Sequence, residues 1–91
     1  MAIQLEDFSL LLRGAIAEAR SAGLVNPADA LEARASVAYT TSSEFLGEVG
    51  QAIVTFLSEG DAAVPPAAVD KLDRCLLQVQ RVWPEIRVRR R

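Results

Sequence analysis

Apolar side chains recur every third or fourth residue along most of this chain, and that spacing restricts the possible folds more than any other feature. A repeat of about 3.6 residues gathers such side chains on one face of an α-helix. No stretch keeps the strict apolar–polar alternation of a half-buried strand. A chain of 91 residues suits one small domain. The spacing therefore predicts an all-α fold, a compact bundle of three to four helices over about residues 5–22, 27–39, 42–58 and 66–82.

Capping residues indicate where these helices begin. Asn26 is a favoured N-cap, and Pro27 suits the first helical position because its missing N–H has no partner there. Thr41 and Glu44 have the spacing of a capping box, which predicts that a new helix begins near residue 42. The alternative is one unbroken helix over residues 27–57, in which the intervening hydroxyl side chains bond back to the preceding turn. Both interpretations remain open at this stage.

Charge is distributed unevenly along the chain. The formal net charge is −2. Residues 1–86 contain six basic and twelve acidic side chains, whereas residues 87–91 contain four arginines and no acidic side chain. We therefore expect residues 1–86 to form a single helical domain and residues 87–91 to form a short basic C-terminal tail.

The absence of histidine and the presence of only one cysteine exclude several kinds of active site. A Ser-His-Asp triad, a Cys-His dyad and a histidine-ligated zinc site all need residues that this chain lacks. Cys75 has no disulfide partner, lies on an apolar helix face and is expected to be an inert buried thiol. A lone cysteine of this kind is typical of a reducing compartment, so we expect a cytoplasmic protein. No apolar run reaches the roughly 18 residues of a membrane span, so no membrane partner is expected.

Two carboxylates one helical turn apart are the best candidates for chemistry. Glu44 and Glu48 resemble half of a carboxylate-bridged metal site, but such sites also use a Glu-x-x-His unit. A solvated polar strip is therefore the favoured interpretation. Activation of a serine by lysine would depend on Lys71 alone, and its acidic neighbours Asp70 and Asp73 favour the charged state, which is not a base. We expect no enzymatic activity, no bound metal and no cofactor.

Small residues identify two helix faces as candidate contact surfaces. Gly47 and Gly50 lie within one turn, although each glycine inside a helix costs about 1 kcal/mol relative to alanine. That cost favours a close approach by another helix, either within the fold or from a second copy. The first helix also has a second apolar stripe opposite its main apolar face, which meets either the second helix or another subunit. The predicted interaction surface comprises Leu10, Gly14, Ala17, Gly47, Gly50 and Val54.

The one basic cluster of the chain is its C-terminus, with Arg87, Arg89, Arg90 and Arg91. Guanidinium groups match phosphate geometry, so this cluster suggests contact with nucleic acid or another anion. The rest of the chain is acidic and contains no helix with base-reading basic and polar residues. A solubilising tail is therefore the favoured interpretation of these arginines, and nucleic-acid or anion binding is the alternative function.

Together these features favour a protein that acts by binding rather than by catalysis. We expect a small helical adaptor or regulatory protein. We also expect it to associate with itself, as a homodimer, or with another protein partner. The small-residue faces and the second apolar stripe support this expectation.

Overall fold

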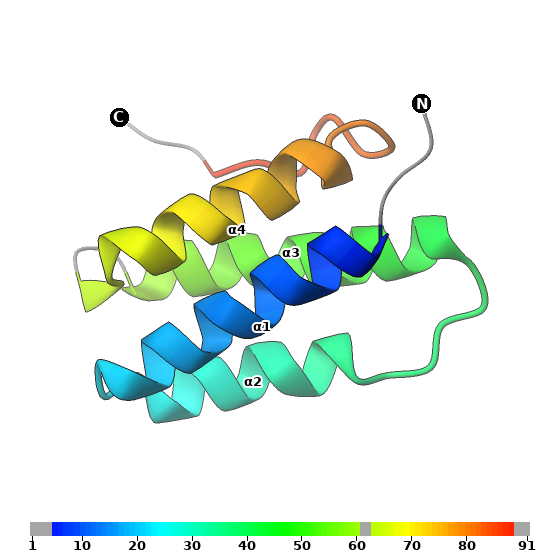
Figure 1. Ribbon diagram of the computed structural model, residues 1–91. Helices are drawn as coiled ribbons and strands as arrows, with labels where there is room; N and C mark the ends of the chain where they lie inside the picture. Colours follow the sequence, from blue (N-terminus) through cyan, green and yellow to red (C-terminus); the bar gives the residue numbers. More distant parts are fainter. Residues whose placement is uncertain (1–4, 61–62, 89–91) are drawn as a thin grey trace.

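Four α-helices make up most of the computed structural model, which describes residues 5–60 and 63–88 (Figure 1). They are α1 (Leu5–Ser21), α2 (Val25–Ala35), α3 (Ser42–Gly60) and α4 (Pro66–Val79). The described residues contain no strand, so the predicted all-α fold is confirmed. None of these four helices combines the length and the apolar character that a membrane crossing requires.

Consecutive helices run antiparallel, so the chain forms an up-down-up-down bundle (Figure 1). Each helix contacts the next one along the chain, and α4 closes the ring by packing against α1. The backbones of the diagonal pairs, α1 with α3 and α2 with α4, do not contact each other in the described part of the chain. The bundle is flat, measuring 34 × 30 × 17 Å. Short links between successive helices favour this arrangement because each helix must return beside the previous one.

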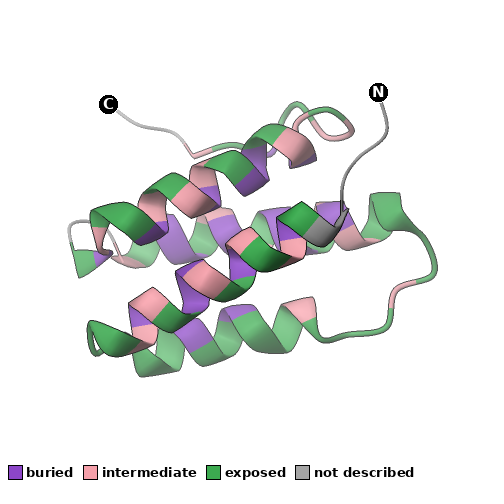
Figure 2. Cartoon of the chain, viewed as in Figure 1, coloured by how far each residue is buried: buried purple, intermediate pink, exposed green. Residues whose placement is uncertain are grey.

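The core is apolar throughout, since no polar or charged residue is buried among those described. Figure 2 shows the buried residues on the inward faces of the helices. The rings of Phe8 on α1 and Phe45 on α3 meet edge to face, with centroids 5.7 Å apart, and so bridge the diagonal of the bundle. The largest fully buried side chains come from all four helices: Phe8, Leu31, Leu46, Val49, Ile53, Leu72, Cys75 and Val79.

A glycine turn joins α1 to α2. Gly23 has a φ of 90°, a conformation that side chains other than glycine rarely adopt. Its N–H donates to the carbonyl of Arg20 at 3.0 Å, and the N–H of Leu24 donates to the carbonyl of Ala19 at 2.9 Å. This pair of bonds is a Schellman motif, which satisfies the last carbonyls of α1 and turns the chain toward α2.

An exposed ion-pair network joins the end of α1 to α2. Arg20 Nη2 lies 2.7 Å from Asp29 Oδ1 and 3.0 Å from Glu32 Oε1. Hydrogen bonds to Glu32 and Asp29 raise the pKa of Arg20, and the hydrogen bond from Arg20 lowers the pKa of Glu32. Because all three side chains are exposed to solvent, this network orients the two helices and adds little stability.

The predicted N-cap of the second helix is wrong. α2 begins at Val25, its N-cap residue is Leu24, and no side chain caps it. The N–H of Ala28 donates to the carbonyl of Leu24 at 3.1 Å, so the first helical turn starts directly after the Schellman motif. Asn26 consequently lies inside the helix and does not cap it.

Side-chain hydroxyl groups donate hydrogen bonds to backbone carbonyls near the end of α2. Ser36 Oγ donates to the carbonyl of Glu32 at 2.8 Å, and the hydroxyl of Tyr39 donates to the carbonyl of Arg34 at 2.8 Å. The helix ends at residue 35, earlier than the predicted residue 39, and the chain between α2 and α3 is non-helical. The alternative of one helix over residues 27–57 is therefore wrong.

The predicted capping box begins α3, with one difference. Thr41 Oγ1 accepts the backbone N–H of Glu44 at 3.1 Å, as the spacing predicts. The carboxylate of Glu44 returns to the backbone N–H of Thr40 at 3.4 Å rather than to that of Thr41. Both bonds satisfy backbone donors that lack partners at a helix start.

Beyond α4 the chain turns back across α3 as a segment that we call the C-terminal strap, residues 80–88. The predicted helix extends to about residue 82, but α4 ends at Val79. Just beyond this end, the N–H of Trp83 donates to the carbonyl of Val79 at 2.8 Å. Gln80 Nε2 donates to the carbonyl of Ile86 at 3.2 Å, and the Ile86 side chain is buried. The strap is thus part of the packed structure.

Gly50 permits the strap and α4 to approach α3. A Cβ atom at this position would lie 2.6 Å from Val79 Cγ1 and 3.2 Å from Ile86 Cγ2. Real Cβ atoms essentially never come as close as the first of these distances. The side chain of Val79 is fully buried and stiff at χ1, so it cannot turn aside easily.

We expect Gly50→Ala to lower the free energy of unfolding by about 1–3 kcal/mol, because overpacking outweighs the gain in helix propensity. Gly14→Ala is the matched control. Its Cβ would meet only the flexible Lys71 methylenes, at 3.1 Å, so its stability should be unchanged or rise by up to about 1 kcal/mol. Urea unfolding of both variants measures the difference, and equal stabilities would refute the steric explanation.

Candidate functional site

Two hollows lie on either side of the exposed polar strip of α3. One lies between α2 and α3, and we call it the α2–α3 groove. The other lies between α3 and the C-terminal strap, and we call it the Trp83 hollow. Glu48 and Gln51 line both hollows, so α3 forms the ridge between them. This part of the surface is the candidate site for a partner.

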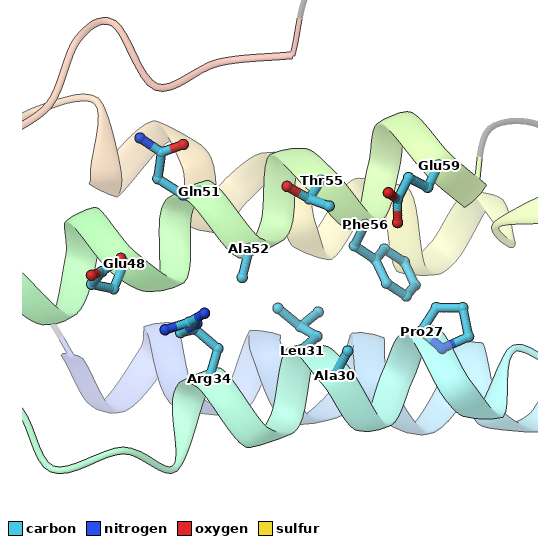
Figure 3. Close-up of a pocket in the computed structure, with 10 residues that line it drawn as sticks. All are labelled: Pro27, Ala30, Leu31, Arg34, Glu48, Gln51, Ala52, Thr55, Phe56 and Glu59. Atoms are coloured by element: carbon cyan, nitrogen blue, oxygen red, sulfur yellow. The ribbon is translucent and has the colours of Figure 1, made fainter.

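The α2–α3 groove has an apolar floor and a polar rim. Leu31 and Phe56 are buried at its base, and the small side chains of Ala30 and Ala52 leave the space between the helices open. Its volume is about 270 Å³. Figure 3 shows the residues that line it: Pro27, Ala30, Leu31 and Arg34 from α2, and Glu48, Gln51, Ala52, Thr55, Phe56 and Glu59 from α3.

Charged side chains stand at both ends of this groove. Arg34 and Glu48 lie near one end, and Glu59 lies near the other, beside Phe56 and Pro27 (Figure 3). No hydrogen bond or ion pair within the described residues engages the side-chain charges of Arg34, Glu48 or Glu59. Unpaired charges around an apolar floor are typical of a binding groove, because they can orient a partner without filling the groove themselves.

Trp83 forms one wall of the second hollow. Its indole Nε1 donates to the carbonyl of Ser43 at 2.8 Å, which anchors the strap to the first turn of α3. A Cβ atom on Gly47 would lie 3.1 Å from Nε1 and 3.2 Å from Cε2 of that ring. Gly47 therefore leaves room for the indole, and the ring is held rigidly beside the hollow.

Three carboxylates surround the Trp83 hollow, which has a volume of about 270 Å³. They belong to Glu44, Glu48 and Glu85, and all three residues are exposed. Across residues 5–60 and 63–88 no three His, Cys, Asp or Glu residues are close enough together to hold a metal ion. The carboxylates are thus distributed around the hollow and do not converge on one point.

The glycine pair predicted as a contact surface is occupied by the chain itself. Trp83 covers Gly47, and Val79 with Ile86 covers Gly50. Gly50 is buried, so another molecule cannot reach it. Of the two interpretations of these glycines, close packing inside one chain is the arrangement found.

The other predicted surface residues do not gather on one face. Leu10 is 66% exposed and Ala17 is exposed, whereas the side chain of Lys71 lies over Gly14. Lys71 Nζ also pairs with a carboxylate of α1, that of Glu18, at 2.8 Å. Val54 is half-buried against the core. The backbones of α1 and α3 do not contact each other, so these residues do not form a single surface.

Of the predicted anion-binding arginines, only Arg87 falls within the described residues. It is exposed and lies beside α4, where it lines a shallow hollow with Asp73 and Leu77. The other three, Arg89, Arg90 and Arg91, lie outside the described residues.

Neither Trp83 as a site residue nor the α2–α3 groove was identified from the sequence. A signal for the groove is present in the sequence, because α2 carries several small apolar residues. The short side chains of Ala30 on α2 and Ala52 on α3 leave the groove above Leu31 open. Pairs of alanines on facing helices can therefore indicate a groove as well as a tight crossing.

Cys75 is fully buried, and its thiol donates weakly to the carbonyl of Phe8 at 3.7 Å. Burial raises the pKa of this thiol from 9.0 to about 12. The neutral thiol is therefore the stable form, which makes Cys75 a poor nucleophile.

This shift predicts an alkaline loss of stability. As pH rises above about 9, the unfolded chain releases the thiol proton that the folded chain retains, so the free energy of unfolding falls. Between pH 8 and pH 10.5 the fall should be about 2 kcal/mol greater in the natural chain than in Cys75→Ala. Urea unfolding at several pH values measures it, and parallel pH profiles for the two proteins would contradict the assignment.

The chain matches no family model, no curated protein and no solved structure in comparisons with each. Its function must therefore be inferred from its own residues. The α2–α3 groove and the Trp83 hollow, one on each side of the α3 ridge, are the features from which that inference proceeds.

Proposed function

We propose that this protein is a non-catalytic interaction module that binds another protein through the α2–α3 groove. The observation that carries the proposal is the groove itself, with an apolar floor and charges on its rim that pair with nothing in the described chain. Burial of apolar surface supplies the affinity in such grooves, and the rim charges supply orientation.

The dimensions of the groove suit a short helix. Glu48 and Glu59 stand eleven residues apart on α3, which corresponds to about 16 Å along the helix axis. A partner helix of about three turns matches that length. Its apolar face would cover Leu31 and Phe56, and basic side chains on it would meet Glu48 and Glu59.

The small area of this groove supports an adaptor or regulatory role. Interfaces of limited size bind weakly and reversibly, as regulatory contacts do. The lone Cys75, buried and without a disulfide partner, supports a reducing cytoplasm as the place of action. A hydrolytic role receives no support from Lys71, because its ammonium group pairs with Glu18.

Site-specific photo-crosslinking in the cell that produces the protein tests this proposal. A photoreactive residue replacing Thr55, in the groove, should yield a discrete adduct with one protein. The same residue replacing Asp70, on the exposed face of α4, should yield none.

A blocking variant makes the test specific to the groove. Ala30→Arg places a long side chain over the floor and should abolish the adduct formed at position 55. Ala33→Arg, also exposed on α2 but outside the groove, is the matched control and should leave the adduct intact. Adducts that form equally at positions 55 and 70, or that survive Ala30→Arg in a folded protein, would refute the proposal.

A further inference from the structure

The Trp83 hollow combines an aromatic wall with an acidic rim and contains no cationic lining residue. The indole ring of Trp83 is anchored by its hydrogen bond to the carbonyl of Ser43. Glu44, Glu48 and Glu85 surround it, and Ile86 adds apolar surface. No ion pair neutralises these carboxylates within residues 5–60 and 63–88.

An arginine side chain matches this combination better than a metal ion or an aliphatic group. A guanidinium group stacks on an indole face and forms paired hydrogen bonds with carboxylates. The carboxylates are too dispersed to ligate one metal ion. Several arginines in succession could meet carboxylates on different sides of the hollow.

The chain itself carries such a segment, with four arginines among its last five residues. The strap, however, directs its end away from the hollow. It runs from Trp83 back along α4, away from the end of the bundle where α3 begins (Figure 1). Arg87 accordingly lies against α4, beside Asp73 and Leu77.

From this geometry and the charge complementarity, we propose that the Trp83 hollow binds the arginine-rich C-terminus, residues 87–91, of a second copy of this chain. A tail on one copy enters a hollow on the other, and in a two-fold symmetric dimer each copy supplies both a tail and a hollow. Two copies can exchange tails to form a closed dimer. The attraction joins exposed charges, so it should weaken as salt is added. This association is separate from the proposed function of the α2–α3 groove.

Sedimentation velocity of the full chain, at low and at high salt, tests the proposal. The natural chain should associate at low salt, and its association constant should fall at least tenfold at high salt. Glu44→Gln/Glu85→Gln and Arg89→Gln/Arg90→Gln/Arg91→Gln should each lower the low-salt constant at least tenfold. Glutamine at position 44 retains the acceptor of the capping box, and neither acidic substitution alters the α2–α3 groove.

Mixing the two variants distinguishes exchange between chains from a tail that folds back. The hollow of the arginine variant and the tail of the glutamate variant are both intact, so the mixture should associate although each variant alone does not. Asp7→Asn/Asp70→Asn removes two acidic charges outside both the hollow and the α2–α3 groove and is the matched control, which should associate like the natural chain.

Three results would overturn the proposal. The first is a natural chain that stays monomeric at every concentration and salt level. The second is association that survives both sets of substitutions. The third is Trp83 fluorescence that responds to the arginine substitutions in a monomer, which would place each tail in its own hollow. None of these results bears on the proposed function of the α2–α3 groove, because the photo-crosslinked adduct at position 55 should form equally in Glu44→Gln/Glu85→Gln.

Discussion

The close approach of α4 and the strap to α3 is the contact on which the rest of the structure depends. Val79 and Ile86 lie against Gly50, and Trp83 lies against Gly47, so two glycines on one turn of α3 receive three large side chains. That approach joins α3 to α4, and α4 in turn closes the ring by packing against α1. Without it, α3 would lose one of its two helical neighbours and the Trp83 hollow would lose its aromatic wall. The unfavourable helix propensity of glycine is thus offset by packing.

On the opposite side of α3, the neighbouring helix α2 supplies small side chains, and a groove remains between the two helices. Ala52 on α3 and Ala30 on α2 both line the α2–α3 groove, and their short side chains leave the space above Leu31 open. The same helix therefore carries a filled contact on one side and an open groove on the other. The difference lies in the neighbouring element, because the strap supplies tryptophan and isoleucine where α2 supplies alanine.

Periodicity predicted the fold class because burial of an apolar stripe is a local property that depends on residue spacing. The helices and the buried Cys75 followed from it, whereas the capping box followed from the spacing of Thr41 and Glu44. Asn26 was misassigned because the Schellman turn at Gly23 begins α2 without a side-chain cap. The contact surface was harder to predict, because the sequence does not show whether Leu10 or Gly47 is covered by another part of the chain. The strap covers Gly47 and Lys71 lies over Gly14, whereas Leu10 stays exposed, and these contacts are set by tertiary packing.

The two candidate surfaces share Glu48 and Gln51, yet they suit partners of different chemistry. The groove offers buried apolar surface, which stabilises a complex with little dependence on salt. The hollow offers exposed carboxylates, whose attraction for arginine falls off within a Debye length of about 8 Å at physiological salt. A shared exposed carboxylate couples two such sites only weakly, because solvent screens its charge. If both proposals hold, the α3 ridge holds a partner helix on one side and a second copy's tail on the other, and ionic strength then changes self-association without abolishing the apolar contact.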